Sequence, residues 1–398
     1  MMRVLHVVRT FYPDSDGGME RAVDHICTAT GRHGIDSHVF ALSPHPRKEP
    51  FRHGDVTVHQ RKRHIEVASC SISLNTLRYF RELVADMDVV HYHFPWPFAD
   101  VLHLLTASGK PAVVTYHADV VRQRRLERLY RPVRRRFLAS VDTVVATSPQ
   151  YRRTSEVLRE LHEERTRVIP LGLEEHRYPI PSASRVRVWK ECVGEGFFFF
   201  VGVLRYYKGL HVLLDALRYT DQRVVIAGHG PVEKALKAQA AQLGLGNQVI
   251  FTGHLDDDED KMALMRLCRG FVFPSHRRSE AFGISLIEAA MAKRPLITTE
   301  LATGTSYVNK HEETGLVVRP ADPQGLAHAM ERLAREPKTA QRLGNGARAR
   351  FETHLTADIS LAQYARLYTS LLHPGHWNPE TSNVSPTHQE RVSNHERT

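Results

Sequence analysis

Two glutamates spaced eight residues apart, Glu280 and Glu288, are the side chains whose positions most strongly indicate chemistry. Glu280 follows a short apolar run at residues 270–275, and Glu288 lies on the helix that the next apolar positions predict. The first turn of a helix has unpaired N–H groups and a positive dipole, which attract anions and polar ligands. Carboxylates at that end do not suit phosphate. They suit hydroxyl groups, because an ionised carboxylate accepts hydrogen bonds from a diol.

Each glutamate alone has a simpler interpretation. Glu280 could be a loop carboxylate stabilised by the helix dipole, and Glu288 an ordinary helix residue. The whole run from residue 274 to residue 289 is more specific, because it resembles the E-x7-E motif of the GT4 family of retaining glycosyltransferases. The resemblance implies a GT-B fold, in which two Rossmann-like domains face a cleft. It also implies that Glu280 contacts the donor sugar and that Glu288 binds the ribose hydroxyls of the nucleotide.

Two basic residues follow the strand predicted at residues 197–203. Arg205 and Lys208 lie at a strand-to-helix turn, where they could neutralise a diphosphate. The segment is similar to the family pattern G-R-x4-K-G, whose two basic residues bind the donor phosphates. Lys208 matches that pattern, whereas Val203 stands where the family has arginine. Arg205 is a substitute two residues later, which leaves the second phosphate contact open.

Backbone groups of the same half are expected to approach the donor nucleotide. Glycines after a strand allow a ligand to come close to the main chain, and the start of a helix offers N–H groups. The resemblance therefore predicts nucleotide contacts at Gly228, Gly230, Phe282, Gly283 and Ile284.

The first half of the chain alternates β-branched runs with helical patterns, which predicts a parallel α/β sheet. Ligands bind at the carboxyl ends of such strands. The predicted strands lie at residues 3–8, 37–41, 56–60, 89–93, 112–116, 143–146 and 167–170.

Two of these strand ends carry candidate site residues. Gly17 and Gly18 open a helix and would let N–H groups approach a diphosphate, although such a pair is often only a turn. The resemblance implies a loop here that closes on donor and acceptor. His117 follows the fifth strand. In the family a histidine at this place points at the donor sugar, and the alternative is a hydrogen-bonded structural histidine.

Metal binding is not predicted. His91 and His93 face the same side of a strand, but the sequence shows no further ligand near them. The aromatic turn at residues 94–98 could stack on a sugar or anchor itself on the core. The acidic run 256–260 is interpreted as the first turn of a helix, favoured by its dipole. GT-B enzymes of this kind need no metal, so a metal-independent enzyme without a cofactor is expected.

The chain is basic, with a net charge of +10 and a pI of about 9.5, which favours anionic partners. The segment from Arg122 to Arg136 holds eight arginines and one glutamate, together with apolar positions such as Leu129, and Phe137 directly follows it. Pro132 is expected to break or kink this helix. A basic amphipathic helix indicates contact with anionic membrane or a lipid-linked acceptor. A solvated face is the simpler alternative, and no nucleic-acid-binding motif is evident.

The four scattered cysteines predict reduced thiols, and no apolar run approaches the roughly 20 residues needed to span a bilayer. A cytoplasmic protein is therefore expected, with peripheral contact at the inner face of the plasma membrane. The predicted organisation is an acceptor-binding domain at residues 1–172, a nucleotide-sugar-binding domain at 173–355, a returning helix at 356–372 and a disordered tail at 373–398. Residues 174–187 are predicted to be a linker.

The expected function is transfer of a hexosyl residue with retention of its anomeric configuration. The segments RYYKG, SEAFGISLIE and GTSYVN resemble bacterial mannosyl- and rhamnosyltransferases of lipopolysaccharide O-antigen synthesis. This resemblance implies a GDP-sugar donor and a lipid-linked glycan acceptor. One alternative is a UDP-sugar with another acceptor. The other is a non-catalytic protein that binds anionic surfaces, which Val203 and the arginine segment would favour.

Overall fold

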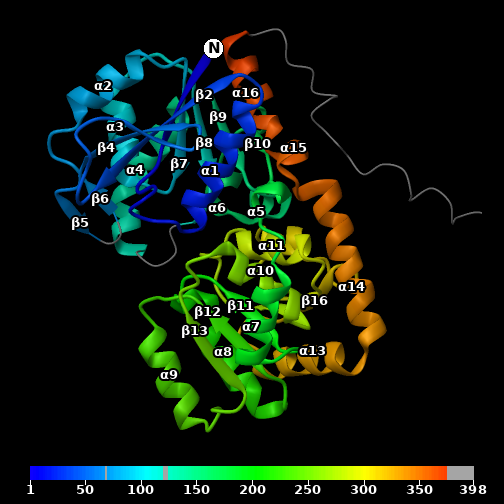
Figure 1. Cartoon of the computed structure of the whole chain (residues 1–398). Coiled ribbons are helices and arrows are strands. Elements are labelled where there is room, and N and C mark those ends of the chain that lie inside the picture. Colours follow the sequence, from blue (N-terminus) through cyan, green and yellow to red (C-terminus); the bar gives the residue numbers. More distant parts are fainter. Residues whose placement is uncertain (68–69, 120–123, 374–398) are drawn as a thin grey trace, which may run out of the picture.

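The computed structural model describes residues 1–67, 70–119 and 124–373. They form two lobes, each built on a mostly parallel sheet with helices on both faces (Figure 1). Sheets covered on both faces need strands that are apolar throughout. The side chains of Phe198, Phe199 and Phe200 in the second lobe are accordingly all fully buried.

The first lobe contains an eight-stranded sheet in the order β10-β9-β8-β7-β1-β2-β4-β3, in which only β3 is antiparallel to its neighbour. A small hairpin of β5 and β6 lies beside it. The strands of the first lobe are β1 (Met2–Val7), β2 (Ile35–Ser43), β3 (Phe51–His53), β4 (Val56–Lys62), β5 (Ile65–Val67), β6 (Cys70–Ile72), β7 (Val89–Phe94), β8 (Ala112–Tyr116), β9 (Thr143–Ala146) and β10 (Thr166–Val168). Its helices are α1 (Gly18–Gly31), α2 (Leu77–Ala85), α3 (Pro97–Thr106), α4 (Arg124–Ser140), α5 (Pro149–Thr154), α6 (Glu156–Arg159) and η1 (Glu163–Arg165).

The second lobe contains a six-stranded parallel sheet in the order β13-β12-β11-β14-β15-β16. Its strands are β11 (Phe198–Val201), β12 (Val224–Ala227), β13 (Val249–Gly253), β14 (Gly270–Phe273), β15 (Leu296–Thr299) and β16 (Gly315–Val318). Its helices are η2 (Glu175–Arg177), α7 (Ala183–Val193), η3 (Tyr206–Lys208), α8 (Leu210–Ala216), η4 (Leu217–Tyr219), α9 (Glu233–Gln242), α10 (Asp258–Leu267), α11 (Ile284–Met291), α12 (Thr305–Val308), α13 (Pro323–Arg335), α14 (Pro337–Arg350) and η5 (Phe351–Leu355).

The chain crosses between the lobes twice, and the two crossings are bonded to each other. Leu173 N donates to Leu355 O at 2.9 Å, and Ala357 N donates to Leu173 O at 2.9 Å. A Cβ on Gly172 would lie 2.7 Å from Thr356 O, so only glycine fits this crossing. These crossings lie beside the domain limits expected from the sequence.

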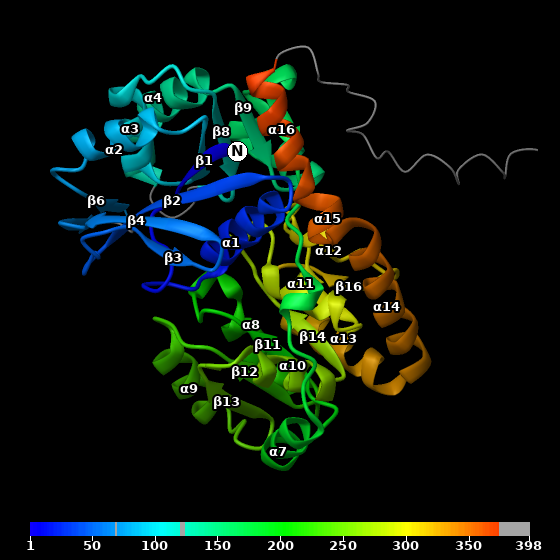
Figure 2. The ribbon, with the colours of Figure 1, turned by 45° about the horizontal axis from the view of Figure 1, so that its top comes forward.

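The last helices return to the first lobe. After α15 (Ala357–Ser360), α16 (Ala362–Leu372) lies along that lobe in both ribbon views (Figures 1 and 2). Tyr364 and Tyr368 of α16 are fully buried in the same apolar cluster as Val4 of β1 and Val113 of β8. The predicted tail lies outside the described residues from position 374 onward.

Two local predictions are wrong. The stretch 174–187 is not linker throughout, because α7 begins at Ala183, where the Ser182 hydroxyl accepts from Arg185 N at 3.2 Å. Such N-caps stabilise a helix start. For Pro132 the expected break is wrong, because helix α4 continues through this residue, while the alternative of a kink stays a prediction. Pro132 and Arg128, one turn earlier, are exposed, so water can satisfy the carbonyl that loses its partner.

None of the helices in the described part of the chain is long and apolar enough to cross a membrane. All four cysteines are free, and Cys27 and Cys268 are buried.

Candidate functional site

Lys208 and Glu280 form an ion pair at the carboxyl edge of the second sheet. Lys208 ends η3 after β11, and Glu280 lies in the loop after β14. The neighbouring Gly209 has φ 71°, and a Cβ there would lie 2.0 Å from Pro274 O. Glycine therefore lets the two loops approach closely enough for the ion pair to form. The structure thus brings together two of the residues predicted for the donor site.

The ion pair is shielded from solvent, since the side chains of Lys208 and Glu280 are only 12% and 8% exposed. Burial alone would lower the pKa of Lys208, but the carboxylate of Glu280 outweighs it and the pKa is raised. The Ser275 hydroxyl donates to Glu280 Oε2 at 3.2 Å, and the Thr303 hydroxyl donates to the Glu280 carbonyl at 2.9 Å. These bonds hold the carboxylate in one orientation beside a fixed positive charge.

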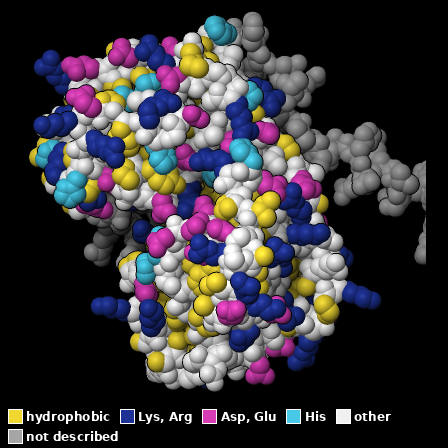
Figure 3. Space-filling view, in the orientation of Figure 1, with side chains coloured by type: hydrophobic (Ala, Val, Ile, Leu, Met, Phe, Trp, Pro, Cys, Tyr) yellow, Lys and Arg dark blue, Asp and Glu magenta, His cyan; other side chains and the backbone are white. Residues whose placement is uncertain are grey.

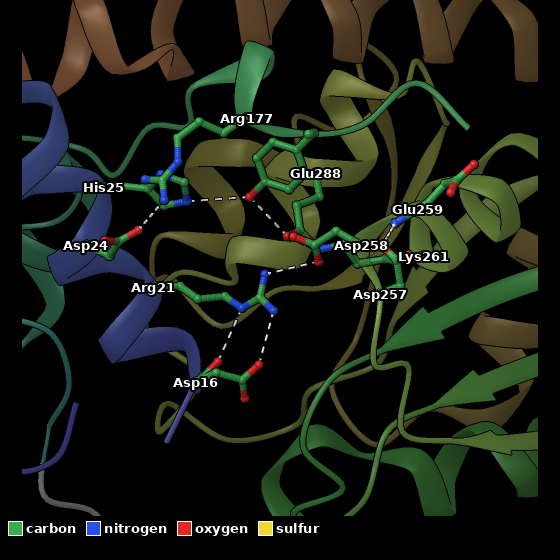
Figure 4. Close-up of polar contacts among 11 residues, drawn as sticks. Asp16, Arg21, Asp24, His25, Arg177, Asp257, Asp258, Glu259, Lys261 and Glu288 are labelled. Carbon is green, nitrogen blue, oxygen red and sulfur yellow. Dashed lines mark hydrogen bonds and ion pairs between the residues drawn. The ribbon is translucent and has the colours of Figure 1, made fainter. Parts of the chain in front are cut away.

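Glu288 is buried on α11 and has two protein partners (Figure 4). Lys261 Nζ lies 2.7 Å from Glu288 Oε1, and the Tyr178 hydroxyl donates to the same oxygen at 3.1 Å. Lys261 also lies 2.8 Å from Asp258. Residues of α10 and α11 therefore form a second buried Lys–Glu pair in the same lobe.

Arg21 of α1 reaches from the first lobe to this second pair (Figure 4). Its guanidinium lies 3.4 Å from Asp258 and 3.2 Å from Asp16. Burial alone would lower the pKa of Arg21. The negative charges of Glu288 and Asp258 outweigh this effect, so the pKa of Arg21 is raised. The predicted glycine loop before α1 is thereby linked to the predicted ribose-binding glutamate. Along this band between the lobes, acidic and basic side chains gather together (Figure 3).

The two predicted glycines differ in what surrounds them. A Cβ on Gly17 would lie 2.7 Å from Glu20 Oε2, whereas Gly18 has open space around it. Glu20 in turn accepts from the Thr10 hydroxyl at 2.5 Å. A side chain at position 17 would have to displace only the flexible end of Glu20, so the packing does not by itself require glycine there, and diphosphate binding at this loop stays a prediction.

Asp119, two residues after His117, joins the first lobe to the second. Asp119 accepts from the Ser155 hydroxyl at 2.7 Å and lies 3.4 Å from Arg278. Arg278 precedes Glu280 by two residues, so this ion pair ties the segment after β8 to the loop that carries Glu280. Burial lowers the pKa of His117 to about 4, which keeps its ring neutral at neutral pH.

Behind His117 lies a cluster of histidines that the sequence analysis missed. His6 of β1 pairs in register with His91 of β7, so His6, His91 and His93 lie together, with one nitrogen each within 4.8 Å of the others. The expectation that no third ligand lies near His91 and His93 is therefore wrong. However, both nitrogens of His91 are hydrogen-bonded, to the Thr115 hydroxyl at 2.7 Å and the Tyr368 hydroxyl at 2.6 Å.

The aromatic turn after β7 anchors the loop on the core. Phe94 and Trp96 are each 1% exposed, and the Trp96 indole donates to Ser71 O at 2.9 Å. Stacking of these two rings on a sugar, which the sequence left open, is excluded by their burial.

The remaining donor-site predictions are only partly explained by contacts within the protein. Arg205 is exposed, and its positive charge acts to lower the pKa of Lys208, against the larger effect of Glu280. A Cβ on Gly228 would lie 2.1 Å from Gly202 O, and one on Gly230 would lie 2.3 Å from Leu204 O. Both glycines therefore allow the loops after β11 and β12 to pack, and their contact with a nucleotide base stays a prediction.

The start of α11 is shaped by Phe282, Gly283 and Ile284. Gly283 precedes the helix with φ 94°, a conformation that favours glycine, and Ile284 is the first helical residue. Phe282 is buried, and a Cβ on Gly304 would lie 2.3 Å from its ring. The loop after β15 thus packs directly on the segment between the two motif glutamates.

The acidic run 256–260 begins α10, as predicted. Asp257 caps the helix by accepting from Glu259 N at 2.8 Å. Sequence reasoning nevertheless missed that Asp258 and Lys261 contact the site. Their spacing of three residues on a helix is the one local signal. Arg21 lies 237 residues before Asp258, and Tyr178 lies 110 residues before Glu288.

The basic helix α4 is less uniformly exposed than its sequence suggests. Arg134 is buried near the buried carboxyl group of Asp100. Burial raises the pKa of Asp100, and the charge of Arg134 opposes this rise. Arg135 pairs with Glu160 at 3.0 Å. Phe137 is buried as expected, but Leu129 is 80% exposed. Of the predicted membrane-contact segment Arg122–Arg136, residues 122 and 123 lie outside the described residues.

Both lobes match models of glycosyltransferase families. Residues 16–177 match Glycosyltransferase Family 4, and residues 187–350 match Glycosyl transferases group 1. The chain is 52% identical over 358 residues to the D-rhamnosyltransferase WbpZ of Pseudomonas aeruginosa, a match that covers 89% of this chain and 93% of that protein. It is 48% identical over 371 residues to the O-antigen chain mannosyltransferase C of Escherichia coli, covering 93% and 99% respectively.

Solved structures share the arrangement of the two lobes. Sucrose-phosphate synthase from Thermosynechococcus elongatus superposes with a TM-score of 0.78 at 21% identity, covering 93% of this chain and 99% of that one. Anabaena HepE in complex with UDP-glucose gives a TM-score of 0.76 at 19% identity, covering 93% and 100%. At such identities the likeness concerns the fold.

Proposed function

Because the chain belongs to the family 4, group 1 glycosyltransferases and has their GT-B fold, we propose that it transfers a mannosyl or D-rhamnosyl residue from a GDP-sugar to a lipid-linked glycan in O-antigen synthesis. Glycosyl transfer itself follows from the family. The sugar is inferred from the two relatives that are about half identical over nearly their whole length. The guanine base, the acceptor and retention of the anomeric configuration are inferences from the sequence motifs.

The buried ion pair of Lys208 and Glu280 is the observation that carries this proposal. In our mechanism Lys208 turns its ammonium to the diphosphate as charge develops on the leaving group, with the N–H groups at the start of α11 assisting. Glu280, already held by Ser275, then accepts hydrogen bonds from the sugar hydroxyls. Arg205 is exposed and free to fold onto the second phosphate.

Glu288 would bind the ribose hydroxyls. Its carboxylate is fixed by Lys261 and Tyr178, so it meets the diol without reorganising. His117 would complete the site from the first lobe as a neutral ring beside the sugar. The reaction proceeds by front-face attack of the acceptor hydroxyl, so no protein nucleophile is required, and no metal is needed because Lys208 supplies the positive charge.

The acceptor would be presented at a membrane surface. The exposed part of α4 carries Arg128, Arg131 and Arg136 next to exposed Leu129. Arginines around one exposed leucine suit the interface of an anionic bilayer. Sedimentation with phosphatidylglycerol vesicles, but not with phosphatidylcholine vesicles, is expected at low salt. Arg128→Gln with Arg136→Gln should reduce it, and unchanged sedimentation would remove α4 from this role.

Thermal unfolding with GDP, UDP and ADP, each with and without EDTA, tests the donor. A ligand that binds only the folded chain raises the midpoint once its concentration exceeds the Kd. We expect a shift with GDP that EDTA does not change. A shift with UDP alone would overturn the donor, and no shift with any nucleotide would favour a binding-only protein.

Transfer assays with GDP-mannose and GDP-D-rhamnose then separate the two sugars. The anomeric configuration of the product, measured by NMR, tests retention. Inversion would exclude the front-face mechanism while leaving the donor assignment intact.

A further inference from the structure

Three histidine rings of the first lobe are connected in a line. His117 Nε2 lies 2.9 Å from His93 Nδ1, and His93 Nε2 lies 3.1 Å from His6 Nδ1. The rings also stack, with centroids 5.2 Å apart for His93 and His117 and 5.4 Å apart for His6 and His93. We call His117, His93 and His6 the imidazole chain. It runs from His117, directly after β8, to the fully buried His6 in β1.

Each link of the imidazole chain needs one proton. A neutral imidazole has one N–H donor and one acceptor nitrogen, so the direction of one hydrogen bond fixes the direction of the next. Two orders are therefore possible. Either all three rings carry the proton on Nδ1 and donate toward His117, or all three carry it on Nε2 and donate toward His6.

The buried end of the chain distinguishes the two orders. His6 Nε2 is buried and has no hydrogen-bond partner among the described residues. If it carried a proton, a buried N–H would be left unpaired, and such groups are rarer in proteins than unpaired acceptors. The order with the proton on every Nδ1 avoids this.

We infer that His93 and His6 are positioning residues that hold His117 as the Nδ1–H tautomer, so that its Nδ1–H faces the site as a hydrogen-bond donor. His117 Nδ1 makes no hydrogen bond to any part of the chain that the structure describes, in contrast to its Nε2. This inference rests on the proposed function, because a bound sugar oxygen is the acceptor that Nδ1–H would meet.

A metal ion is the competing use of these rings. His6, His91 and His93 satisfy the distance requirement for three ligands. A metal ion bound there would break the hydrogen bond between His6 and His93. It would also break one of the two hydrogen bonds of His91, to Thr115 or to Tyr368. The existing hydrogen bonds therefore favour the imidazole chain.

Nitrogen-15 NMR of the histidine rings in the full chain tests the tautomers directly. We expect the shifts of His6, His93 and His117 to report Nδ1–H and a bare Nε2. His6→Phe, which removes a ring that does not touch His117, should then mix the two tautomers of His117. His6→Asn should restore the pure tautomer, because its amide can replace Nδ1, and His6→Gln should not.

His91→Gln is the matched control. It is as deeply buried as His6 but bonds Thr115 and Tyr368 rather than the imidazole chain, so the His117 tautomer should remain pure. Nε2–H shifts in the unaltered chain, or a pure His117 tautomer in His6→Phe, would overturn the inference. Copurification of one zinc ion that His6→Phe loses would do the same.

Kinetics give an independent readout. His6→Phe should lower kcat for glycosyl transfer by about tenfold and leave KM for the donor nearly unchanged, since a lost transition-state hydrogen bond acts on kcat. His6→Asn should recover most of it. If the unaltered chain transfers no sugar, the proposed function fails, whereas the tautomers measured by NMR still decide the role of the imidazole chain.

Discussion

The carboxyl edges of the two sheets contain buried polar groups of opposite character. On the second sheet, Lys208 pairs with Glu280 and Lys261 with Glu288, so the edge holds charged pairs. On the first sheet, the histidines are buried and burial lowers the pKa of each, so the edge is neutral. Fixed charges suit a donor that leaves as a diphosphate. A neutral edge suits hydroxyl groups, which need directed hydrogen bonds rather than charge.

The largest effect is expected at the charged edge, from Glu280→Gln. The amide keeps the size of the side chain but loses the charge that orients the sugar, so kcat should fall by about 100- to 1,000-fold. Circular dichroism should show an intact fold. Glu160→Gln, on an exposed pair with Arg135, is the control and should leave kcat unchanged. An enzyme that keeps most of its rate would remove Glu280 from catalysis.

Lys208→Met should weaken binding of the donor nucleotide while the fold stays intact. Loss of a charge-assisted contact to the diphosphate costs about 1.5–3 kcal/mol, or roughly 10- to 100-fold in affinity for GDP. Titration calorimetry measures this, and Lys208→Arg should recover part of it. If GDP affinity were unchanged, the phosphate contact would have to come from elsewhere, with Arg205 as the first candidate.

The buried histidines of the first sheet should make the stability of the protein depend on pH. The pKa values of His6 and His117 are lowered from 6.5 to about 3 and about 4. Between pH 6.5 and pH 4 the unfolded chain therefore binds protons that the folded chain excludes, and stability falls as the pH falls. Each such histidine adds up to about 1.4 kcal/mol per pH unit to that slope.

Urea unfolding at pH 6.5, 5.5 and 4.5 measures this slope. His6→Phe should reduce the slope by removing one titrating ring whose pKa burial lowers. An equal slope in the unaltered chain and in His6→Phe would show that the cluster does not titrate as described.

The smallest effect is expected where the two edges meet, at Arg21. Its contact with Asp258 is long and partly exposed, with side-chain exposures of 29% and 38%. Arg21→Gln should therefore cost only about 0.2–1 kcal/mol in stability and raise the KM for the donor a few-fold. A loss comparable to that of Glu280→Gln would instead place Arg21 in the chemistry.

Local patterns predicted much of the architecture. Each predicted strand of the first lobe is present, and the prediction for β8 at residues 112–116 agrees with its bounds. The short strands β3, β5 and β6 were missed, since three residues carry little periodicity. The exposure of Leu129 and the burial of Arg134 were also missed, because they depend on which helix face meets α3 rather than on composition.

The sequence by itself determined the family, the alternation of strands and helices, and the two-glutamate motif of Glu280 and Glu288. These depend on residues close together in the chain, where spacing and residue type carry the information. Only the tertiary structure decided which distant side chains meet, such as His6 with His93 or Arg21 with Asp258. The physical reason is that strand order is set by packing of the whole sheet. That order places β1 beside β7 and so brings His6, 87 residues before His93, into contact with it.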